Sequence, residues 1–142
     1  VSDFDDQFWK NRYESIRDFE KHLAENGTSV IKIFLHIAKD EQKKRFIDRI
    51  DEQEKNWKFS MGDLPERALW DQYMSAYEEA INETSKDYAP WFVIPADDKW
   101  FARVAAIQII IDALEDMKLK FPKLSEADQK ELASAKKQLE NE

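Results

Sequence analysis

The sequence predicts an α/β domain that is predominantly helical and contains a short parallel sheet. Two apolar runs, residues 30–37 and 91–94, are rich in β-branched and aromatic residues, and the first is apolar enough for a strand buried on both faces. The long connection between them carries helical patterns, which favours parallel pairing. With 142 residues, 42% hydrophobic content and only two glycines, the chain fits one domain with few flexible linkers.

The first helix is expected at residues 5–26. Asp3, Asp5 and Asp6 lie near its start, and Gly27 follows its last residue as a C-terminal cap. Five apolar residues recur at helical spacing within it, and we expect this stripe to pack on the sheet. The stripe consists of Trp9, Tyr13, Ile16, Phe19 and Leu23.

Two helices are expected between the strands, at about 39–51 and 64–83. Asp63 and Glu66 fit a capping box at the start of the second helix, with Pro65 in its first turn. One side of this second helix is apolar and aromatic, so we expect that side to be buried. Its members are Trp70, Tyr73, Met74, Tyr77 and Ile81.

Four cations surround the joint between these helices. Arg45 and Arg49 lie four residues apart on one helical face, where a bound anion would relieve their repulsion. Lys55 and Lys58 follow in a segment without a clear helical period. Residues 39–58 carry a net charge of about +1 and the remainder about −9, so the pattern predicts a mobile phosphate-binding segment. The aromatic residues expected to pin it to the core are Trp57 and Phe59.

The second strand leads into a long apolar helix, which we expect to be the main core helix. Asp97 or Asp98 is predicted to cap its start, and a loop at this end of a parallel strand is where open α/β sheets bind ligands. Farther on, Ser125 and Asp128 fit a capping box for a last helix with a thin apolar stripe. A two-stranded parallel sheet leaves edges and apolar faces uncovered, so we expect a part of a larger fold.

Composition argues against several classes of function. The net charge of −8 disfavours binding to nucleic acid or to an anionic membrane, since both require a basic surface. The chain has no cysteine, signal peptide or apolar run of membrane-spanning length, which favours a cytoplasmic protein. His22 and His36 have no partner at metal-ligand spacing, and we interpret both as structural.

Eight short motifs, taken together and in order, resemble the polyphosphate kinase type 2 family. The resemblance extends from about Trp9 to Met117. Its order and spacing make it far more specific than any single motif. The motifs are Phe34-Leu-His, Glu41-Gln-Lys-Lys-Arg-Phe46, Glu54-Lys-Asn-Trp-Lys-Phe-Ser60, Glu66-Arg-Ala-Leu-Trp-Asp-Gln-Tyr-Met74, Ala76-Tyr-Glu78, Thr84-Ser85, Ala89-Pro-Trp91 and Ile94-Pro-Ala-Asp-Asp-Lys-Trp-Phe101.

The resemblance implies a three-layer P-loop kinase-like fold and phosphoryl transfer between inorganic polyphosphate and a nucleoside mono- or diphosphate, with Mg²⁺ as the metal. Residues 1–118 then correspond to the C-terminal half of such a domain, with a helical lid at about 39–83, and residues 119–142 to a helical extension. The family's Gly-rich phosphate loop and acidic strand end are missing, because the chain contains only Gly27 and Gly62. We therefore expect the fragment alone to be inactive and the intact protein to be a homo-oligomer.

Roles are predicted for eight residues, of which the resemblance places Arg45, Arg49, Lys55 and Lys58 in the lid over the reacting phosphates. Arg45 and Arg49 would be catalytic, since arginine offers planar bidentate donors to phosphate. The residues that would bind phosphate or polyphosphate are Lys55, Lys58 and Arg67, and those on the nucleotide side are Asp71, Lys99 and Arg103.

Structural interpretations remain open beside these roles. Glu41 and Arg45, and likewise Arg67 and Asp71, have the spacing of ordinary helical ion pairs. Lys99 and Arg103 can equally form a solvated face. The alternative function is a non-catalytic helical binding or oligomerisation module.

Overall fold

The computed structural model describes residues 5–141, so Asp3 lies outside the described residues. Helices dominate it, as the sequence predicts, and two strands form one sheet. The elements in chain order are α1 (Asp6–Glu25), β1 (Lys32–His36), α2 (Lys39–Asp51), the 3₁₀ helix η1 (Gln53–Lys58), α3 (Asp63–Ala68), α4 (Trp70–Thr84), β2 (Trp91–Pro95), α5 (Lys99–Asp116) and α6 (Glu126–Leu139).

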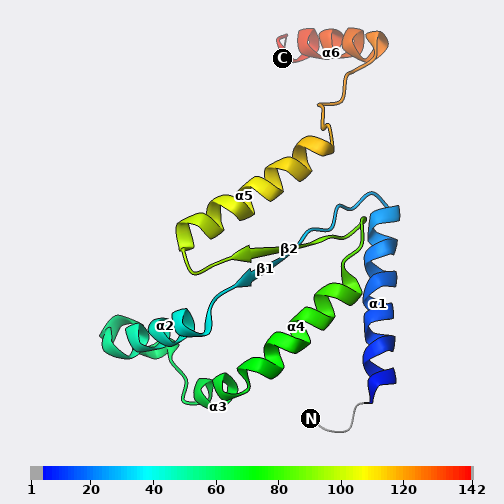
Figure 1. The fold of residues 1–142 in the computed structure, drawn as a ribbon. Coiled ribbons are helices and arrows are strands. Elements are labelled where there is room, and N and C mark those ends of the chain that lie inside the picture. The colour runs from blue at the N-terminus through cyan, green and yellow to red at the C-terminus, as the bar shows by residue number, and fades with distance from the viewer. Residues whose placement is uncertain (1–4, 142) are drawn as a thin grey trace.

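Three layers make up the body of the molecule (Figure 1). Helix α5 lies on one side of the sheet, and α4 with α1 beside it lies on the other. The rings of Phe34 in β1 and Tyr77 in α4 meet at a centroid distance of 4.7 Å, which joins the sheet to α4. The buried core on the opposite side consists of Ile94, Ala96 and Ala102.

The two strands pair in parallel, as the sequence predicts. Lys32 lies opposite Trp91 and His36 opposite Pro95. The expectation that β1 is buried on both faces is wrong, because Leu35 is 54% exposed, His36 is also exposed and the other three residues of the strand are only partly buried. The sheet within residues 5–141 has only two strands, and each strand is therefore an edge strand although its sequence is apolar.

Helix α1 has the predicted caps but not the predicted neighbour. The Asp5 carboxylate accepts the Phe8 N–H at 2.8 Å, and Gly27 closes the other end with φ 84°, a conformation that favours glycine. The apolar stripe contacts α4 rather than the sheet: Tyr13 is buried, whereas Phe19 remains exposed. This expectation was wrong because α4 occupies the sheet face that α1 would need.

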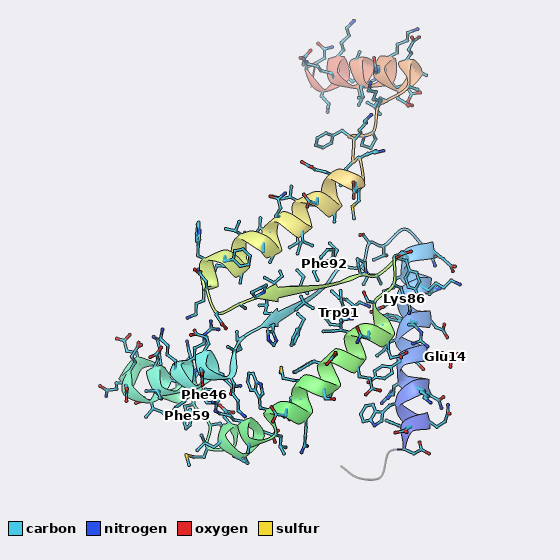
Figure 2. All side chains as sticks on the ribbon, viewed as in Figure 1. Glu14, Phe46, Phe59, Lys86, Trp91 and Phe92 are labelled. Atoms are coloured by element: carbon cyan, nitrogen blue, oxygen red, sulfur yellow. The ribbon has the colours of Figure 1, made fainter. Side chains whose placement is uncertain are left out.

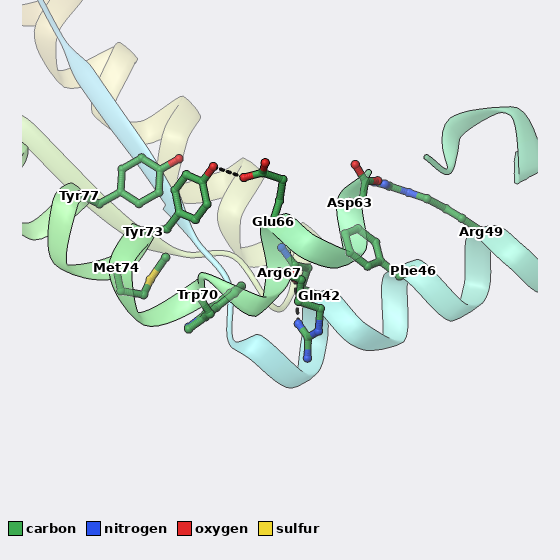
Figure 3. A pocket seen from close by; sticks show the side chains of 10 residues that line it. All are labelled: Gln42, Phe46, Arg49, Asp63, Glu66, Arg67, Trp70, Tyr73, Met74 and Tyr77. Atoms are coloured by element: carbon green, nitrogen blue, oxygen red, sulfur yellow. Dashed lines mark hydrogen bonds between the residues drawn. The ribbon is translucent and has the colours of Figure 1, made fainter. Parts of the chain in front are cut away.

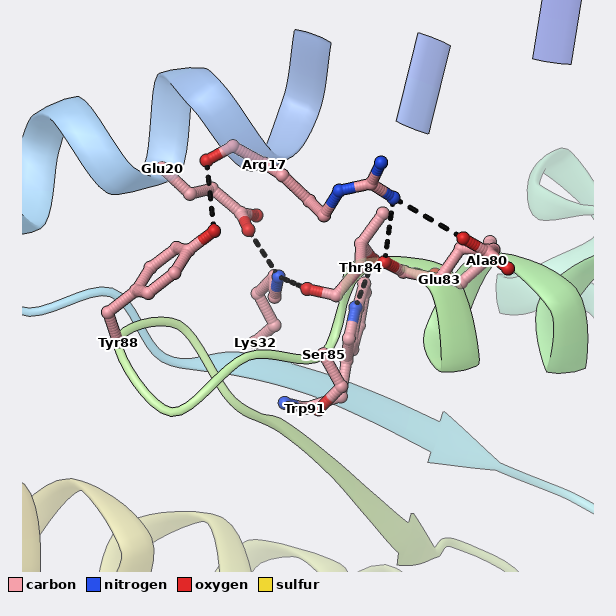
Figure 4. Close-up of polar contacts among 9 residues, drawn as sticks. All are labelled: Arg17, Glu20, Lys32, Ala80, Glu83, Thr84, Ser85, Tyr88 and Trp91. Atoms are coloured by element: carbon pink, nitrogen blue, oxygen red, sulfur yellow. Dashed lines mark hydrogen bonds and ion pairs between the residues drawn. The ribbon is translucent and has the colours of Figure 1, made fainter. Parts of the chain in front are cut away.

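One buried ionic cluster joins α1, β1, α4 and β2 (Figure 4). The Lys32 ammonium lies 2.5 Å from a carboxylate oxygen of Glu20 and donates to the Thr84 carbonyl at 2.8 Å. It also lies 5.5 Å from the ring centroid of Trp91, whose indole N–H donates to the Thr84 hydroxyl at 2.9 Å. A charge inside an apolar strand is thus compensated from three other elements.

The second central helix is divided in two. Leu69 separates α3 from α4, and the start of α3 has Gly62 as its N-cap with no side-chain hydrogen bond. The predicted capping box of Asp63 and Glu66 is therefore wrong. The Glu66 carboxylate instead accepts a hydrogen bond from the Tyr73 hydroxyl, one turn beyond the break.

The segment between α2 and α3 is helical, which the sequence interpretation missed. The Asn56 side-chain amide holds η1 against the end of α2 by donating to the carbonyls of Arg49 and Ile50. Phe59 packs edge-on against Phe46 of α2 at 5.9 Å, as Figure 2 shows. Trp57, in contrast, is 79% exposed, so its predicted role as a core anchor is wrong.

Helix α5 packs against the core cluster, as expected of the main core helix, but it is only partly covered. Its start matches the prediction, because Asp98 accepts the N–H groups of Trp100 and Phe101 at 2.8 and 3.1 Å. Only its sheet-facing side is covered, however: Ala102 is buried, whereas Ile107 is exposed. A helix that is apolar all round needs neighbours on more than one side, but the described residues cover α5 only on the side that faces the sheet.

Helix α6 stands beyond the C-terminal end of α5, apart from the three layers (Figure 1). The predicted capping box is present, with the Ser125 hydroxyl accepting the Asp128 N–H at 3.1 Å and Asp128 accepting in return. All described residues of this helix are exposed. None of the helices within residues 5–141 combines the length and the apolar character needed to cross a membrane.

The Lys32–Glu20 pair should contribute much more to stability than a surface pair. The two side chains are 12% and 10% exposed, and Lys32→Met would leave the Glu20 charge buried without a partner. We expect a loss of about 3 kcal/mol in the free energy of unfolding, measured by urea denaturation. Lys21→Met removes the exposed Lys21–Glu25 pair and should cost less than about 1 kcal/mol. Equal small losses in both variants would contradict this interpretation.

Candidate functional site

Two of the cavities beside α2 are lined by predicted site residues. The first, which we call the α2–α4 cleft, has a volume of about 380 Å³ and lies between α2 and the α3–α4 pair (Figure 3). The second, the strand-end cavity, has a volume of about 210 Å³ and lies beyond the carboxyl end of β1, against α5. A cavity of about 450 Å³ at the opposite end of the strands is lined by three carboxylates, which would repel phosphate. These three residues are Asp87, Asp112 and Asp116.

Arg49 is the cation of the α2–α4 cleft that is best placed to receive an anion. Its guanidinium carbon lies 5.6 Å from the ring centroid of Phe46, which orients the side chain without using its N–H groups. It makes no ion pair within residues 5–141. The predicted catalytic arginine therefore keeps its donors available.

Arg67 lines the same cleft but has a structural role as well. One guanidinium nitrogen donates to the Lys39 carbonyl at 2.7 Å and to the Gln42 side chain at 2.8 Å, which holds α3 against the first turns of α2. The alternative Arg67–Asp71 ion pair does not form between these described residues. Asp71 is exposed and does not line the cleft.

Aromatic residues of α4 and the carboxylates of Asp63 and Glu66 line the side of the cleft opposite α2. The Tyr73 hydroxyl donates to Glu66, and Tyr73 stacks on Tyr77 at a centroid distance of 6.4 Å. This hydrogen bond, with the negative charge of the same carboxylate, raises the pKa of the Tyr73 phenol above its ordinary value of 10.0. Because Trp70, Tyr73 and Tyr77 line this side of the cleft, it can offer aromatic faces to a flat ligand.

Arg45 lies in the strand-end cavity instead of beside Arg49. Its Nε donates to Glu41 at 2.8 Å, so the ion pair of the structural interpretation is present. Its Nη2 donates to the carbonyls of Ala96 and Asp97 at 2.7 and 3.1 Å, which ties α2 to the loop after β2. Arginine has five N–H donors, and the two on Nη1 are left over by these contacts.

The strand-end cavity also receives Lys99 and Arg103 from the first turns of α5. Three predicted site residues, Arg45 included, thus converge beyond the carboxyl ends of parallel strands. This position and this charge suit a phosphate group.

The two predicted lysines lie on η1, outside the linings of both cavities. Lys55 forms an ion pair with Glu52, and the Lys58 ammonium lies 5.1 Å from the ring centroid of Trp57. The structure therefore does not bring them together with the arginines in this conformation.

Residues 5–141 contain no group of three or more His, Asp or Glu side chains that could hold a metal ion. His22 shares a 3.4 Å hydrogen bond with Asn26, and His36 lies 5.9 Å from the ring of Phe34. The described residues on their own do not fit a Mg²⁺ site.

Asp97 is the site residue whose role sequence reasoning missed. Its carboxylate accepts the Ala38 N–H at 2.8 Å, so it holds the N-terminus of α2, 59 residues away in sequence. The sequence feature that could have indicated this role is the pair Asp97–Asp98. Asp98 caps α5, so the Asp97 carboxylate remains available to cap another helix. Sequence spacing cannot identify that second helix.

Two parallel strands between helical layers, with cations beyond the strands' carboxyl ends, define a P-loop kinase-like α/β protein. The chain belongs to the polyphosphate kinase 2 (PPK2) family, because the model of that family matches residues 1–122. This agrees with the resemblance in the sequence motifs.

Three similar proteins define the extent of this relationship. An ADP-polyphosphate phosphotransferase of Rhodopseudomonas palustris is 52% identical over 136 residues, which are 96% of this chain and 47% of that protein. An uncharacterized protein in the chlN 3′ region of Leptolyngbya boryana is 52% identical over 134 residues, covering 94% of this chain and 98% of the other. The crystal structure of polyphosphate kinase 2 from Arthrobacter aurescens TC1 matches with a TM-score of 0.84 and 47% identity, over 93% of this chain and 47% of that one. The chain thus spans about half the length of the first and third of these relatives.

The neighbouring carboxylates Asp97 and Asp98 should act on different helices. Asp97→Ala removes the acceptor of the Ala38 N–H, and we expect about 1 kcal/mol less protection, or roughly fivefold faster hydrogen exchange, in the first turn of α2. Asp98→Ala should give the same acceleration at Trp100 and Phe101 and leave α2 unchanged. Each variant is the control for the other, and identical exchange patterns would refute the division of roles.

Proposed function

We propose that this chain forms the lid and C-terminal half of a polyphosphate-dependent nucleotide phosphotransferase. The enzyme would move a phosphoryl group between inorganic polyphosphate and a nucleoside mono- or diphosphate. The observation that carries the proposal is the pair of cation-lined cavities on either side of α2, one at the strand ends and one facing α4. The R. palustris relative, named as an ADP-polyphosphate phosphotransferase, supports the reaction class.

The two catalytic arginines divide the work in this proposal. Phosphoryl transfer requires mainly positioning and stabilisation of charge that spreads over the equatorial oxygens. Arg49, which has no ion pair within residues 5–141, donates to the transferring group from the cleft side. Arg45 holds α2 in place and uses its remaining Nη1 donors on a phosphate in the strand-end cavity.

The remaining site residues bind substrate without touching the reacting bond. Lys99 and Arg103 neutralise phosphate at the strand ends. Lys55 and Lys58 on η1 act as point charges along a polyphosphate chain. Arg67, in the last turn of α3, binds phosphate at the rim of the cleft. Asp71, in the first turn of α4, lies on the nucleotide side.

Mg²⁺ would supply Lewis-acid stabilisation of the phosphate charge, but the described residues do not gather the carboxylates to hold it. A Gly-rich phosphate loop is also missing from the sequence, which has only two glycines. We therefore expect the 142-residue chain on its own to be unable to transfer phosphoryl groups.

The expected partners and location of the enzyme follow from its substrates and its charge. The substrates are polyanions bound locally, while the net charge of −8 disfavours nucleic acid and anionic membranes as partners. We propose a cytoplasmic enzyme, consistent with the absence of cysteine, that forms a homo-oligomer.

The isolated chain should form no nucleoside triphosphate when incubated with polyphosphate, nucleoside diphosphate and Mg²⁺, because the phosphate loop is missing. A coupled luminescence assay would measure this. A chimera in which this chain replaces the matched 136 residues of the R. palustris protein should be active under the same conditions. Turnover by the isolated chain would contradict its proposed incompetence. A folded but inactive chimera would favour a non-catalytic binding module.

Arg49→Ala in that chimera should lower kcat by at least about 100-fold with little change in folding, since it removes donors to the transition state. Lys43→Ala removes the same charge from an exposed position of α2 outside both cavities, and should leave kcat unchanged. Steady-state kinetics with polyphosphate would compare them. Equal effects of the two variants would refute the role of Arg49.

A further inference from the structure

The carbonyl groups at the end of α2 are bound by a side chain of the next helix. An α-helix leaves the carbonyls of its last turn without donors of its own. Glu52 follows α2 in an extended conformation, with φ −93° and ψ 106°, so it does not provide the left-handed conformation that often ends a helix. The Asn56 amide supplies donors instead, to the Arg49 carbonyl at 2.8 Å and to the Ile50 carbonyl at 2.6 Å.

The geometry of η1 distributes its six residues over three sides. In a 3₁₀ helix, side chains three residues apart lie one above the other. The Phe59 N–H donates to the Asn56 carbonyl at 3.0 Å, which is a contact of this kind. The residues of η1 therefore form three pairs: one contains the residue attached to α2, one is mixed and one is basic. In that order the pairs are Gln53 and Asn56, Glu54 and Trp57, and Lys55 and Lys58.

The basic pair forms a short row of positive charge, which we call the lysine row. Lys58 makes no ion pair within residues 5–141, and its ammonium lies 5.1 Å from the ring centroid of Trp57. Lys55 pairs with Glu52, but these side chains are 45% and 52% exposed, and an exposed pair contributes little. A polyanion can therefore displace Glu52 and bind both lysines.

The lysine row meets a polyanion only in one orientation of η1. Successive residues of a 3₁₀ helix are about 120° apart, so Glu54 occupies the side next to Lys55. A rotation of η1 by one residue would put a carboxylate where Lys55 now lies, and a carboxylate repels phosphate. The contacts that fix the rotation of η1 thus decide the sign of the charge that a substrate meets.

Two contacts hold η1 on α2. The first is the pair of hydrogen bonds from the Asn56 amide to the last turn of α2, the turn that contains Arg49. The second is the edge-on packing of Phe59 against Phe46, with ring centroids 5.9 Å apart. The same Phe46 ring lies 5.6 Å from the guanidinium carbon of Arg49. Both contacts therefore place η1 relative to the arginine of the α2–α4 cleft.

We propose that Asn56 is a positioning residue for polyphosphate binding. It holds η1 on the end of α2 so that the lysine row extends the anion-binding surface that begins at Arg49. Asn56 acts through Lys55 and Lys58 and does not itself touch the substrate. This inference rests on the proposed function, because it concerns the binding of polyphosphate by the same site.

The attachment can be tested in the 142-residue chain without an activity assay. Asn56→Ala should accelerate hydrogen exchange at the Lys55 and Phe59 amides, which close η1, at least about tenfold, while circular dichroism shows unchanged helix content. Gln53→Ala is the matched control, since it removes an exposed amide side chain from the same helix that makes no hydrogen bond within residues 5–141. Equal exchange rates in the two variants would overturn the attachment.

The consequence for binding can be tested by steady-state kinetics in the R. palustris chimera. Asn56→Ala should raise the KM for polyphosphate at least about fivefold and change kcat less than about twofold, because the lysines bind the chain away from the reacting bond. A purely structural defect would instead lower kcat through loss of active enzyme. Gln53→Ala should change neither constant. An unchanged KM in Asn56→Ala would overturn the inference.

A third measurement asks whether Asn56 acts through the lysines. In a Lys55→Ala, Lys58→Ala background, Asn56→Ala should raise KM by less than about a further twofold, because the row that it positions is gone. An undiminished effect in that background would overturn the inference while leaving the proposed function intact. An inactive chimera with the unmodified chain would instead overturn the proposed function, and this inference with it.

Discussion

The Lys32 ammonium is the group on which the arrangement of layers depends. A lysine in an apolar strand has to be desolvated, and that cost is offset only because Glu20 of α1 and the Thr84 carbonyl at the end of α4 meet it at 2.5 and 2.8 Å. Trp91 of β2 completes the cluster through the Thr84 hydroxyl. Two helices and both strands are thereby fixed at one point, which stands in for the larger core that a two-stranded sheet cannot form.

This cluster lies at the amino end of β1, and the candidate site lies at the carboxyl end, about 16 Å away along five residues of strand. The proposed lid leaves the sheet after β1 and returns through α4 to Thr84. Its return is therefore held by the buried cluster, whereas its departure is held by Asp97 on the Ala38 N–H. The intervening helices are attached to the sheet layer at two further points, through Arg45 of α2 on the Ala96 carbonyl and through Tyr77 of α4 on Phe34.

Local patterns predicted what depends on local physics. Apolar periodicity gave the bounds of α2 and the parallel pairing of the strands, and the Ser125–Asp128 capping box formed because its groups are three residues apart. The Asp63–Glu66 box failed because α3 begins one residue earlier than the pattern requires, with Gly62 rather than Asp63 as its N-cap. The Glu66 carboxylate binds the Tyr73 hydroxyl instead. The cations were found by residue type, but their division between two cavities depends on carbonyls about 50 residues away, which no spacing rule reaches.

That division makes α2 the element that contributes a predicted catalytic arginine to each of the two cavities. Arg45 and Arg49 lie one turn apart on this helix, yet one side chain enters the strand-end cavity and the other enters the α2–α4 cleft. The first turn of α2 is held from two sides, by Asp97 on the Ala38 N–H and by Arg67 on the Lys39 carbonyl. Arg45 adds a third attachment, through the carbonyls of Ala96 and Asp97. Arg49 instead lies against the ring of Phe46 on the same helix and makes no ion pair within residues 5–141. The two predicted catalytic arginines therefore differ in how firmly the surrounding structure holds them.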